Sequence, residues 1–163
     1  MRILGIDPGL RLTGFACLEA ARTTRTVAQA TLIEAGVIRL NGKLPVADRL
    51  VELETDLAEI IERTRPRALS VEKLYAHYAH PTTAIVMGHA RGVVLLQARK
   101  SGLDVIELGA TEVKKSLTGN GHASKLQMQE SVRMQLGLPG RPEPADVADA
   151  IAIALCAMRR RVR

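Results

Sequence analysis

Three strand-like segments follow one another near the start of the chain, and their order constrains the fold more than any other feature. Arg2 to Asp7, Gly14 to Leu18 and Thr31 to Leu40 are rich in apolar residues and are joined by short polar connections. Short connections cannot make parallel pairs of strands. We therefore expect a sheet that begins with three antiparallel strands.

After Pro45 the pattern changes to alternating helices and strands. Apolar residues from Val46 to Ile61 repeat every three to four positions, which predicts a helix. The further expected elements are a strand at Ala68–Val71 that closes at Glu72, a helix at Pro81–Lys100, a strand at Asp104–Leu108, and helical segments near Thr111–Leu117, Ser124–Leu136 and Pro144 to about Arg160. This order predicts an α/β protein with a mixed five-stranded sheet flanked by helices. We expect one domain over residues 1–163, with a frayed basic tail at about 159–163.

The charge balance indicates the class of partner. Lysine and arginine number 23 against 17 acidic residues, a formal net charge of +6. This excess favours a polyanion such as nucleic acid, although a solvated arginine-rich surface is the simpler alternative. The apolar run from Ala150 to Met158 is too short to span a bilayer, and no signal-peptide pattern opens the chain. We expect a cytoplasmic protein without a membrane partner.

Four acidic residues occupy positions that suit chemistry better than folding. Asp7 and Glu72 each end a buried strand, where an uncompensated charge is costly. Asp146 and Asp149 are spaced i, i+3 at the start of the last helix, so their Cβ atoms lie about 5–6 Å apart on one face. Each has a structural alternative: Asp7 can start a turn, Asp146 can cap the helix, and Glu72 can pair with a neighbouring cation, Lys73 or Arg91.

These structural alternatives explain the four acids less well when the acids are considered together. Carboxylates that share a cleft repel one another, and bound cations offset that repulsion best. Oxygen ligands without histidine or cysteine favour Mg²⁺ or Mn²⁺. We expect Asp7, Glu72, Asp146 and Asp149 to hold two such ions about 3.5–4 Å apart, the arrangement used for phosphodiester hydrolysis.

The ordered motifs of the chain resemble those of a known nuclease family. The stretches are "ILGIDPGLRLTGFA", "VEKLY", "GHARGV", "VKKSLTGNGHASKLQM" and "PADVADAIAIAL". Together they resemble RuvC, the bacterial Holliday-junction resolvases of the ribonuclease H-like superfamily, from residue 1 to about 157. The resemblance implies that the four acids are catalytic, and that a homodimer nicks opposing strands of a four-way DNA junction during recombination and repair.

The resemblance also implies DNA contacts outside the acids. It assigns them to Tyr75, Arg91, Lys114 and Lys125. The two lysines suit phosphate binding, and an unpaired base can stack on the tyrosine ring. The simpler alternatives are solvated surface lysines and a partly buried tyrosine. His77 and His80 follow Tyr75 closely, and we assign them no metal.

The resemblance further implies partner proteins. Ala84, Gly88 and Gly92 are spaced four residues apart on the second helix, where they permit close backbone approach. Packing on the helix's own sheet is one interpretation, and the resemblance favours a dimer interface. It also implies a branch-migration complex of RuvA and RuvB as partner.

Three other functions compete with this interpretation. They are a YqgF-like RNA-processing nuclease of the same fold, a junction-binding protein without chemistry, and an actin-like ATPase. The first lacks the "GHARGV" helix and the long lysine-bearing segment found here. The second predicts that an acid is lost, whereas all four are present, and the third needs a second domain.

Overall fold

The computed structural model of the chain describes residues 1–20, 30–74 and 81–162. Its strands are β1 (Arg2–Asp7), β2 (Leu12–Ala20), β3 (Ala30–Arg39), β4 (Ala68–Glu72) and β5 (Asp104–Leu108). Its helices are α1 (Val46–Thr64), α2 (Pro81–Lys100), α3 (Ala110–Thr118), α4 (Lys125–Leu136) and α5 (Ala145–Val162). The elements and their order are those predicted from the sequence, with differences of a few residues at the ends.

The strands form one mixed sheet in the order β3-β2-β1-β4-β5. β1, β2 and β3 pair antiparallel, which confirms the predicted start, while β4 pairs parallel with both β1 and β5. The parallel register aligns Ile6 with Val71, so the next residues, Asp7 and Glu72, close adjacent strands at the same end. Sheet register thus brings together two acids that are far apart in the sequence.

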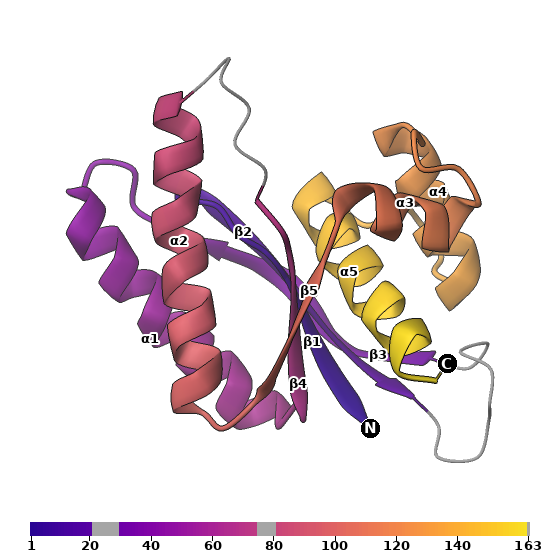
Figure 1. The fold of residues 1–163 in the computed structure, drawn as a ribbon, viewed down its shortest axis with the longest axis horizontal. Helices are drawn as coiled ribbons and strands as arrows, with labels where there is room; N and C mark the ends of the chain where they lie inside the picture. Colours follow the sequence, from indigo (N-terminus) through magenta and orange to yellow (C-terminus); the bar gives the residue numbers. More distant parts are fainter. Residues whose placement is uncertain (21–29, 75–80, 163) are drawn as a thin grey trace.

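Helices cover both faces of the sheet and enclose two separate cores. α1 and α2 lie on one face, and α5 lies on the other, with α3 and α4 packed outside it (Figure 1). The core beneath α1 includes Leu53 and Leu57, and the core beneath α5 includes Ile151 and Leu155. Each of these side chains is removed from water almost completely, which is the main force that fixes the helices.

Two glycines let α5 lie directly on the sheet. A Cβ atom built on Gly5 of β1 would lie 2.2 Å from the Ala150 carbonyl oxygen. A Cβ atom on Gly14 of β2 would lie 2.0 Å from the Asp146 carbonyl oxygen. Because no side chain fits at either position, the first turns of α5 approach the strands closely, beside Asp7.

We expect Gly14→Ala to displace the start of α5 from the sheet. The added methyl group overlaps the Asp146 backbone, so the helix must shift, at a cost of about 1–3 kcal/mol of unfolding free energy. Denaturant unfolding and DNA cleavage should both reveal the change. Gly42→Ala is the matched control, because nothing lies within 4 Å of the Cβ position there. Equal stability of the two variants would contradict this account of helix docking.

The basic C-terminal residues differ from the prediction. Arg159, Arg160 and Arg161 belong to α5 and are held against the protein. Arg161 pairs with Asp104 at 2.7 Å, and Arg160 donates to the Glu107 carbonyl oxygen at 3.1 Å. The expectation of a frayed tail is therefore wrong for these residues, because β5 supplies acceptors that a sequence pattern does not reveal. Among the described residues, no helix is both long and apolar enough to cross a membrane.

Candidate active site

A cleft of about 230 Å³ lies where β1 and β4 end. Three predicted acids line it: Asp7 from β1, Glu72 from β4 and Asp149 from α5. Both predicted lysines line it too, Lys114 from α3 and Lys125 from the start of α4. Five residues from five elements therefore share one cleft in the described structure.

The carboxylates of this cleft are poorly hydrated and repel one another. Burial raises the pKa of Asp7 to about 7, and the charges of Asp149, Asp146 and Glu72 add to the shift. Burial also raises the pKa of Glu72 and of Asp149, and the Lys114 charge opposes both shifts. A cluster whose charged form is disfavoured in this way is suited to binding cations.

The fourth acid lies at the edge of the cluster. Asp146 lines a neighbouring hollow, although it is near enough to raise the pKa of Asp7 and of Asp149. In the described part of the chain, no three His, Cys, Asp or Glu side chains converge closely enough to enclose a metal ion. The structure thus gathers the four carboxylates without closing them into a ligand set. Their oxygen donors are nevertheless those that Mg²⁺ and Mn²⁺ prefer.

The charge of Asp7 should make the metal-free protein less stable as pH rises. The carboxyl has a pKa of about 7 when folded and 3.8 as a free group, so folding favours its protonated form. The resulting stabilisation is complete below pH 4 and is lost as pH rises through 7, at a rate of about 1.4 kcal/mol for each pH unit between the two pKa values.

The pH dependence can be assigned to Asp7 by comparison with Asp7→Asn. In EDTA at pH 8, we expect Asp7→Asn to be more stable than the wild type, with the difference shrinking towards pH 4. Denaturant unfolding at a series of pH values gives the unfolding free energy of both proteins. The difference between the two values removes the contribution of all other titrating groups, which the proteins share. A difference that does not change with pH would show that Asp7 titrates normally.

The end of β4 is held by Arg91 of α2. The Arg91 Nε atom donates to the Glu72 carbonyl oxygen at 3.1 Å, and its guanidinium pairs with the Glu107 carboxylate of β5. In addition, the Lys73 amide donates to the Leu108 carbonyl oxygen at 2.8 Å. Arg91 therefore contacts the backbone of Glu72, and among the described residues the Glu72 carboxylate has no ion pair. Contact of Arg91 with DNA stays a prediction.

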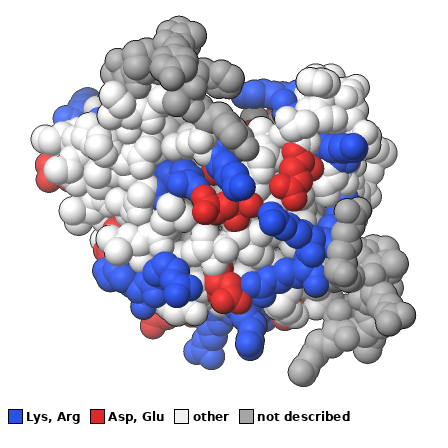
Figure 2. Space-filling model, in the orientation of Figure 1, with Lys and Arg blue, Asp and Glu red and all other residues white. Residues whose placement is uncertain are grey.

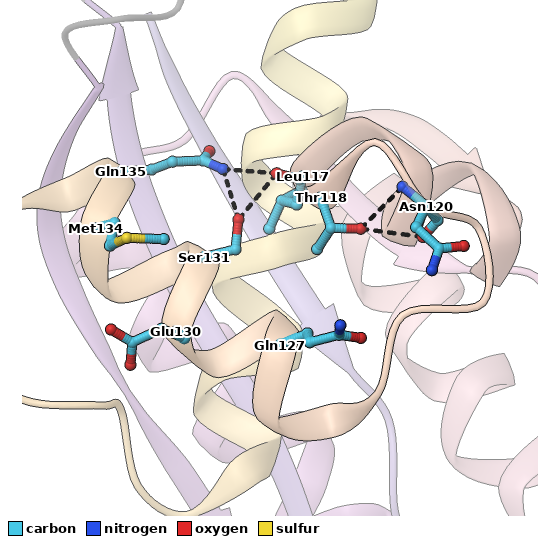
Figure 3. A pocket seen from close by; sticks show the side chains of 8 residues that line it. All are labelled: Leu117, Thr118, Asn120, Gln127, Glu130, Ser131, Met134 and Gln135. Atoms are coloured by element: carbon cyan, nitrogen blue, oxygen red, sulfur yellow. Dashed lines mark hydrogen bonds between the residues drawn. The ribbon is translucent and has the colours of Figure 1, made fainter.

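The two lysines are placed by a joint between α3 and α4. A cavity of about 480 Å³ is lined by residues of both helices, and Figure 3 shows Ser131 and Gln135 of α4 pointing to Leu117 of α3. Both side chains donate to the Leu117 carbonyl oxygen, at 2.8 and 2.9 Å. At its other end α4 is capped by Ser124, whose hydroxyl accepts the Gln127 amide. These contacts fix Lys125, the first residue of α4, in the cleft that Asp7 also lines.

Sequence reasoning did not find the residues that position the site. Gly5 and Gly14 bring α5 onto the sheet, while Ser131 and Gln135 join α3 to α4. A glycine inside an apolar strand signals close backbone approach, so the two glycines could have been recognised. The α4 side chains carry no comparable signal, because polar residues on a helix are usually solvated.

Two groups of predicted site residues stand apart from this cleft. Tyr75, His77 and His80 lie outside the described residues. On α2, Gly88 and Gly92 are exposed, with nothing within 4 Å of their Cβ positions, and Ala84 is half-buried. The two glycines therefore do not pack on their own sheet, and the alternative of internal packing is wrong for them.

Comparison with known proteins agrees with the geometry. A family model described as "Crossover junction endodeoxyribonuclease RuvC" matches residues 3–157. The chain is 47% identical over 154 residues to the protein of that name from Rhodopirellula baltica, covering 94% of this chain and 84% of that one. It is 39% identical over 155 residues to the one from a Synechococcus strain, covering 95% and 96%.

Solved structures show the same fold. Thermus thermophilus RuvC superposes with a TM-score of 0.86 at 31% identity, covering 99% of this chain and 96% of that one. The T. thermophilus protein in complex with a Holliday junction substrate gives a TM-score of 0.86 at 32% identity, with 99% and 97% covered. The ribonuclease H-like fold expected from the motifs is therefore confirmed. With its family match, its relatives and its carboxylate cleft, the chain belongs to the RuvC family of crossover junction endodeoxyribonucleases.

Proposed function

We propose that this protein resolves four-way DNA junctions by hydrolysing one phosphodiester bond in each of two opposing strands. The observation that carries the proposal is the cleft where Asp7, Glu72 and Asp149 face Lys114 and Lys125. The carboxylates suit a metal-assisted attack on phosphorus, and the lysines suit the phosphate on which it occurs. Among relatives, the structure of T. thermophilus RuvC has been solved in complex with a Holliday junction substrate.

Asp7, Glu72, Asp146 and Asp149 are proposed to hold two divalent ions, Mg²⁺ or Mn²⁺. When bound, the ions supply a lowered pKa for the attacking water and stabilise charge on the leaving oxygen. Asp7, which the other three carboxylates influence, is the ligand best placed to serve both ions. Lys125 lowers the pKa of Asp7 and of Asp149, so it favours the charged carboxylates that ligation requires.

The charge of the protein surface suits a polyanion. Figure 2 shows lysine and arginine side chains spread over one face, with acidic side chains among them. The net charge of +6 attracts DNA over a distance. This charge balance supports a binding surface for DNA.

A second copy of the chain is proposed to pack against α2. Ile85, Gly88, Gly92 and Leu96 follow one stripe of this helix, and the two large side chains are 61% and 59% exposed. Val86 and Leu95 of the same helix lie outside this stripe, because both pack against the core of their own chain. The stripe offers exposed apolar side chains on either side of two positions that admit another helix closely.

The location of the protein and its protein partners are also proposed. A junction resolvase acts on DNA in the cytoplasm of a bacterium, and branch-migration proteins of the RuvA and RuvB type are the proposed partners.

The test of the proposed function is substrate choice in the presence of Mg²⁺ or Mn²⁺. We expect the protein to cut a four-way junction in two opposing strands and to leave a linear duplex of the same sequence intact. Preference for structured RNA would favour the YqgF-like alternative. Junction binding without cleavage under either metal would favour the non-catalytic alternative and would contradict the proposal.

A further inference from the structure

A second hollow lies beside the loop that follows β1, next to the carboxylates. It has a volume of about 450 Å³ and shares no residue with the lysine-lined cleft. Its walls come from the loop between β1 and β2, from α1 and α2, and from Asp146 at the start of α5. The cleft described above is lined instead by α3, α4 and Asp149. The carboxylate cluster therefore lies between two hollows, and Asp146 and Asp149 each line one of them.

The loop between β1 and β2 is held rigidly at the edge of the second hollow. The buried Thr13 hydroxyl accepts the Gly9 amide at 3.0 Å and donates to the Gly9 carbonyl oxygen at 2.7 Å. Arg49 of α1 donates from Nη1 to the Leu10 carbonyl oxygen at 3.1 Å, and the Leu40 amide donates to the Arg11 carbonyl oxygen at 3.0 Å. Arg11 is thus carried on a fixed backbone, which lowers the entropic cost of any contact it makes.

Two arginines line this hollow, and the exposed one, Arg11, has hydrogen-bond donors that no described residue uses. The Arg11 side chain is exposed, and within the described ranges it has neither an ion pair nor a hydrogen bond, unlike Arg2, Arg63 and Arg161. The Arg49 Nε atom is buried without an acceptor among those residues. A guanidinium with free donors suits the planar, bidentate recognition of a phosphate.

The remaining walls are apolar. Leu10, Leu12, Val86 and Met87 line the hollow beside the two arginines. A free inorganic anion would gain nothing from these walls, whereas the sugar and base of a nucleotide would bury apolar surface against them. The hollow thus combines cationic donors with an apolar wall and lies next to a catalytic carboxylate. This combination suits one nucleotide of a DNA strand.

We propose that this hollow binds the nucleotide next to the scissile phosphate, on the side away from Lys114 and Lys125. Arg11 contacts the phosphate of that nucleotide, and Leu12 and Met87 contact its sugar and base. Arg49 is a positioning residue that holds the loop through Leu10. The cleaved strand then passes from one hollow to the other across the carboxylates, gripped by cations on both sides. This inference rests on the proposed function, because it takes a DNA strand as the substrate.

The experiment combines the Arg11→Gln variant with DNA in which a single phosphate is replaced by an uncharged methylphosphonate. The wild-type protein first maps the scissile phosphate on a four-way junction. Junctions with a single methylphosphonate at successive flanking positions are then titrated with Asp7→Asn protein, which does not cut them. We expect one flanking methylphosphonate to weaken binding about tenfold, as the loss of a charged hydrogen bond does. In the Asp7→Asn, Arg11→Gln double variant, the same methylphosphonate should cause no further loss.

Arg67→Gln in the same background is the matched control. Arg67 is exposed and precedes β4, at the opposite end of that strand from Glu72, so the variant loses an equal charge far from the hollow. It should keep the full sensitivity to the methylphosphonate. The slope of log affinity against log salt should fall by about 0.7–0.9 for Arg11→Gln if one phosphate contact is lost.

The two proposals fail in different ways. If the wild-type protein does not cut the junction, the proposed function fails and the nucleotide site fails with it. If cleavage occurs but Arg11→Gln and Arg67→Gln respond alike at every flanking phosphate, the resolvase function stands and the second hollow is not a nucleotide site. Circular dichroism melts of the Arg11→Gln variant confirm folding, which the exposure of this side chain leads us to expect.

Discussion

Asp7→Asn should lower junction cleavage by on the order of a thousandfold while leaving junction binding intact. Asparagine has nearly the shape of aspartate, so the packing at the end of β1 is retained. It cannot supply the anionic oxygen that a shared metal ligand needs, and metal ions contribute several kcal/mol to stabilising such a transition state. Each 1.4 kcal/mol lost costs a factor of about ten in rate.

Binding should survive because other residues carry it. The cationic side chains that face DNA in this proposal are Lys114, Lys125 and Arg11, and none of them needs Asp7 for its position. Removal of a negative charge from the cleft can even strengthen the attraction of a phosphate. Single-turnover cleavage and a gel shift on the same junction measure the two quantities separately.

A control variant separates the charge of Asp7 from its location. Asp104→Asn removes an exposed carboxylate that pairs with Arg161. Asp104 begins β5, whereas the site lies at the other end of this strand, where Leu108 is aligned with Glu72. It should cut junctions at a rate close to that of the wild type. Loss of binding by folded Asp7→Asn protein would show that Asp7 takes part in recognition, and retained cleavage would remove it from the catalytic centre.

The antiparallel start of the sheet and the gathering of the acids could be predicted from local patterns. Each acid closes a buried strand or opens an apolar helix, and the polar connections at the start favour antiparallel pairing. The parallel pairing of β4 with β1, which places Glu72 beside Asp7, comes from the structure. The physical reason for the difference is that burial patterns show where strands lie, whereas the choice of a neighbouring strand depends on the packing of the whole sheet.

The parts that could not be predicted depend on contacts between distant elements. Nothing in the run of arginines at the C-terminus indicates that β5 offers Asp104 and the Glu107 carbonyl oxygen to them. The second hollow is equally hidden, because Arg11, Arg49 and Met87 come from three elements that only the fold brings together. Helical spacing alone also did not separate Val86 and Leu95, which pack inward, from Ile85 and Leu96, which face solvent.

Gly88→Glu should give a folded monomer that rarely makes both nicks of a junction in one binding event. A four-way junction has approximate two-fold symmetry, and one protomer carries one carboxylate cleft. A C2 dimer supplies two clefts related by the symmetry of the DNA. A glutamate in the middle of the exposed α2 stripe places a long charged side chain where a second helix would approach, and two such charges would face each other across the axis.

The substitution should spare the protomer itself. Nothing lies within 4 Å of the Gly88 Cβ position. In addition, the helix propensity of glutamate is more favourable than that of glycine by roughly half a kcal/mol. Val51→Glu is the matched control, because Val51 is an apolar residue on α1 that is 65% exposed. It introduces the same charge on a neighbouring helix and should leave both the mass and the cleavage pattern unchanged.

Two measurements decide the outcome. Sedimentation should give a mass near 17.6 kDa for Gly88→Glu and about twice that value for the wild type and for Val51→Glu. On a supercoiled cruciform, paired nicks within one binding event yield linear product, whereas independent nicks yield open circles first. Gly88→Glu should therefore accumulate open circles. A Gly88→Glu protein that remains dimeric would place the interface elsewhere than α2, and a true monomer that still linearises the cruciform in one event would show that paired cleavage does not depend on two symmetric clefts.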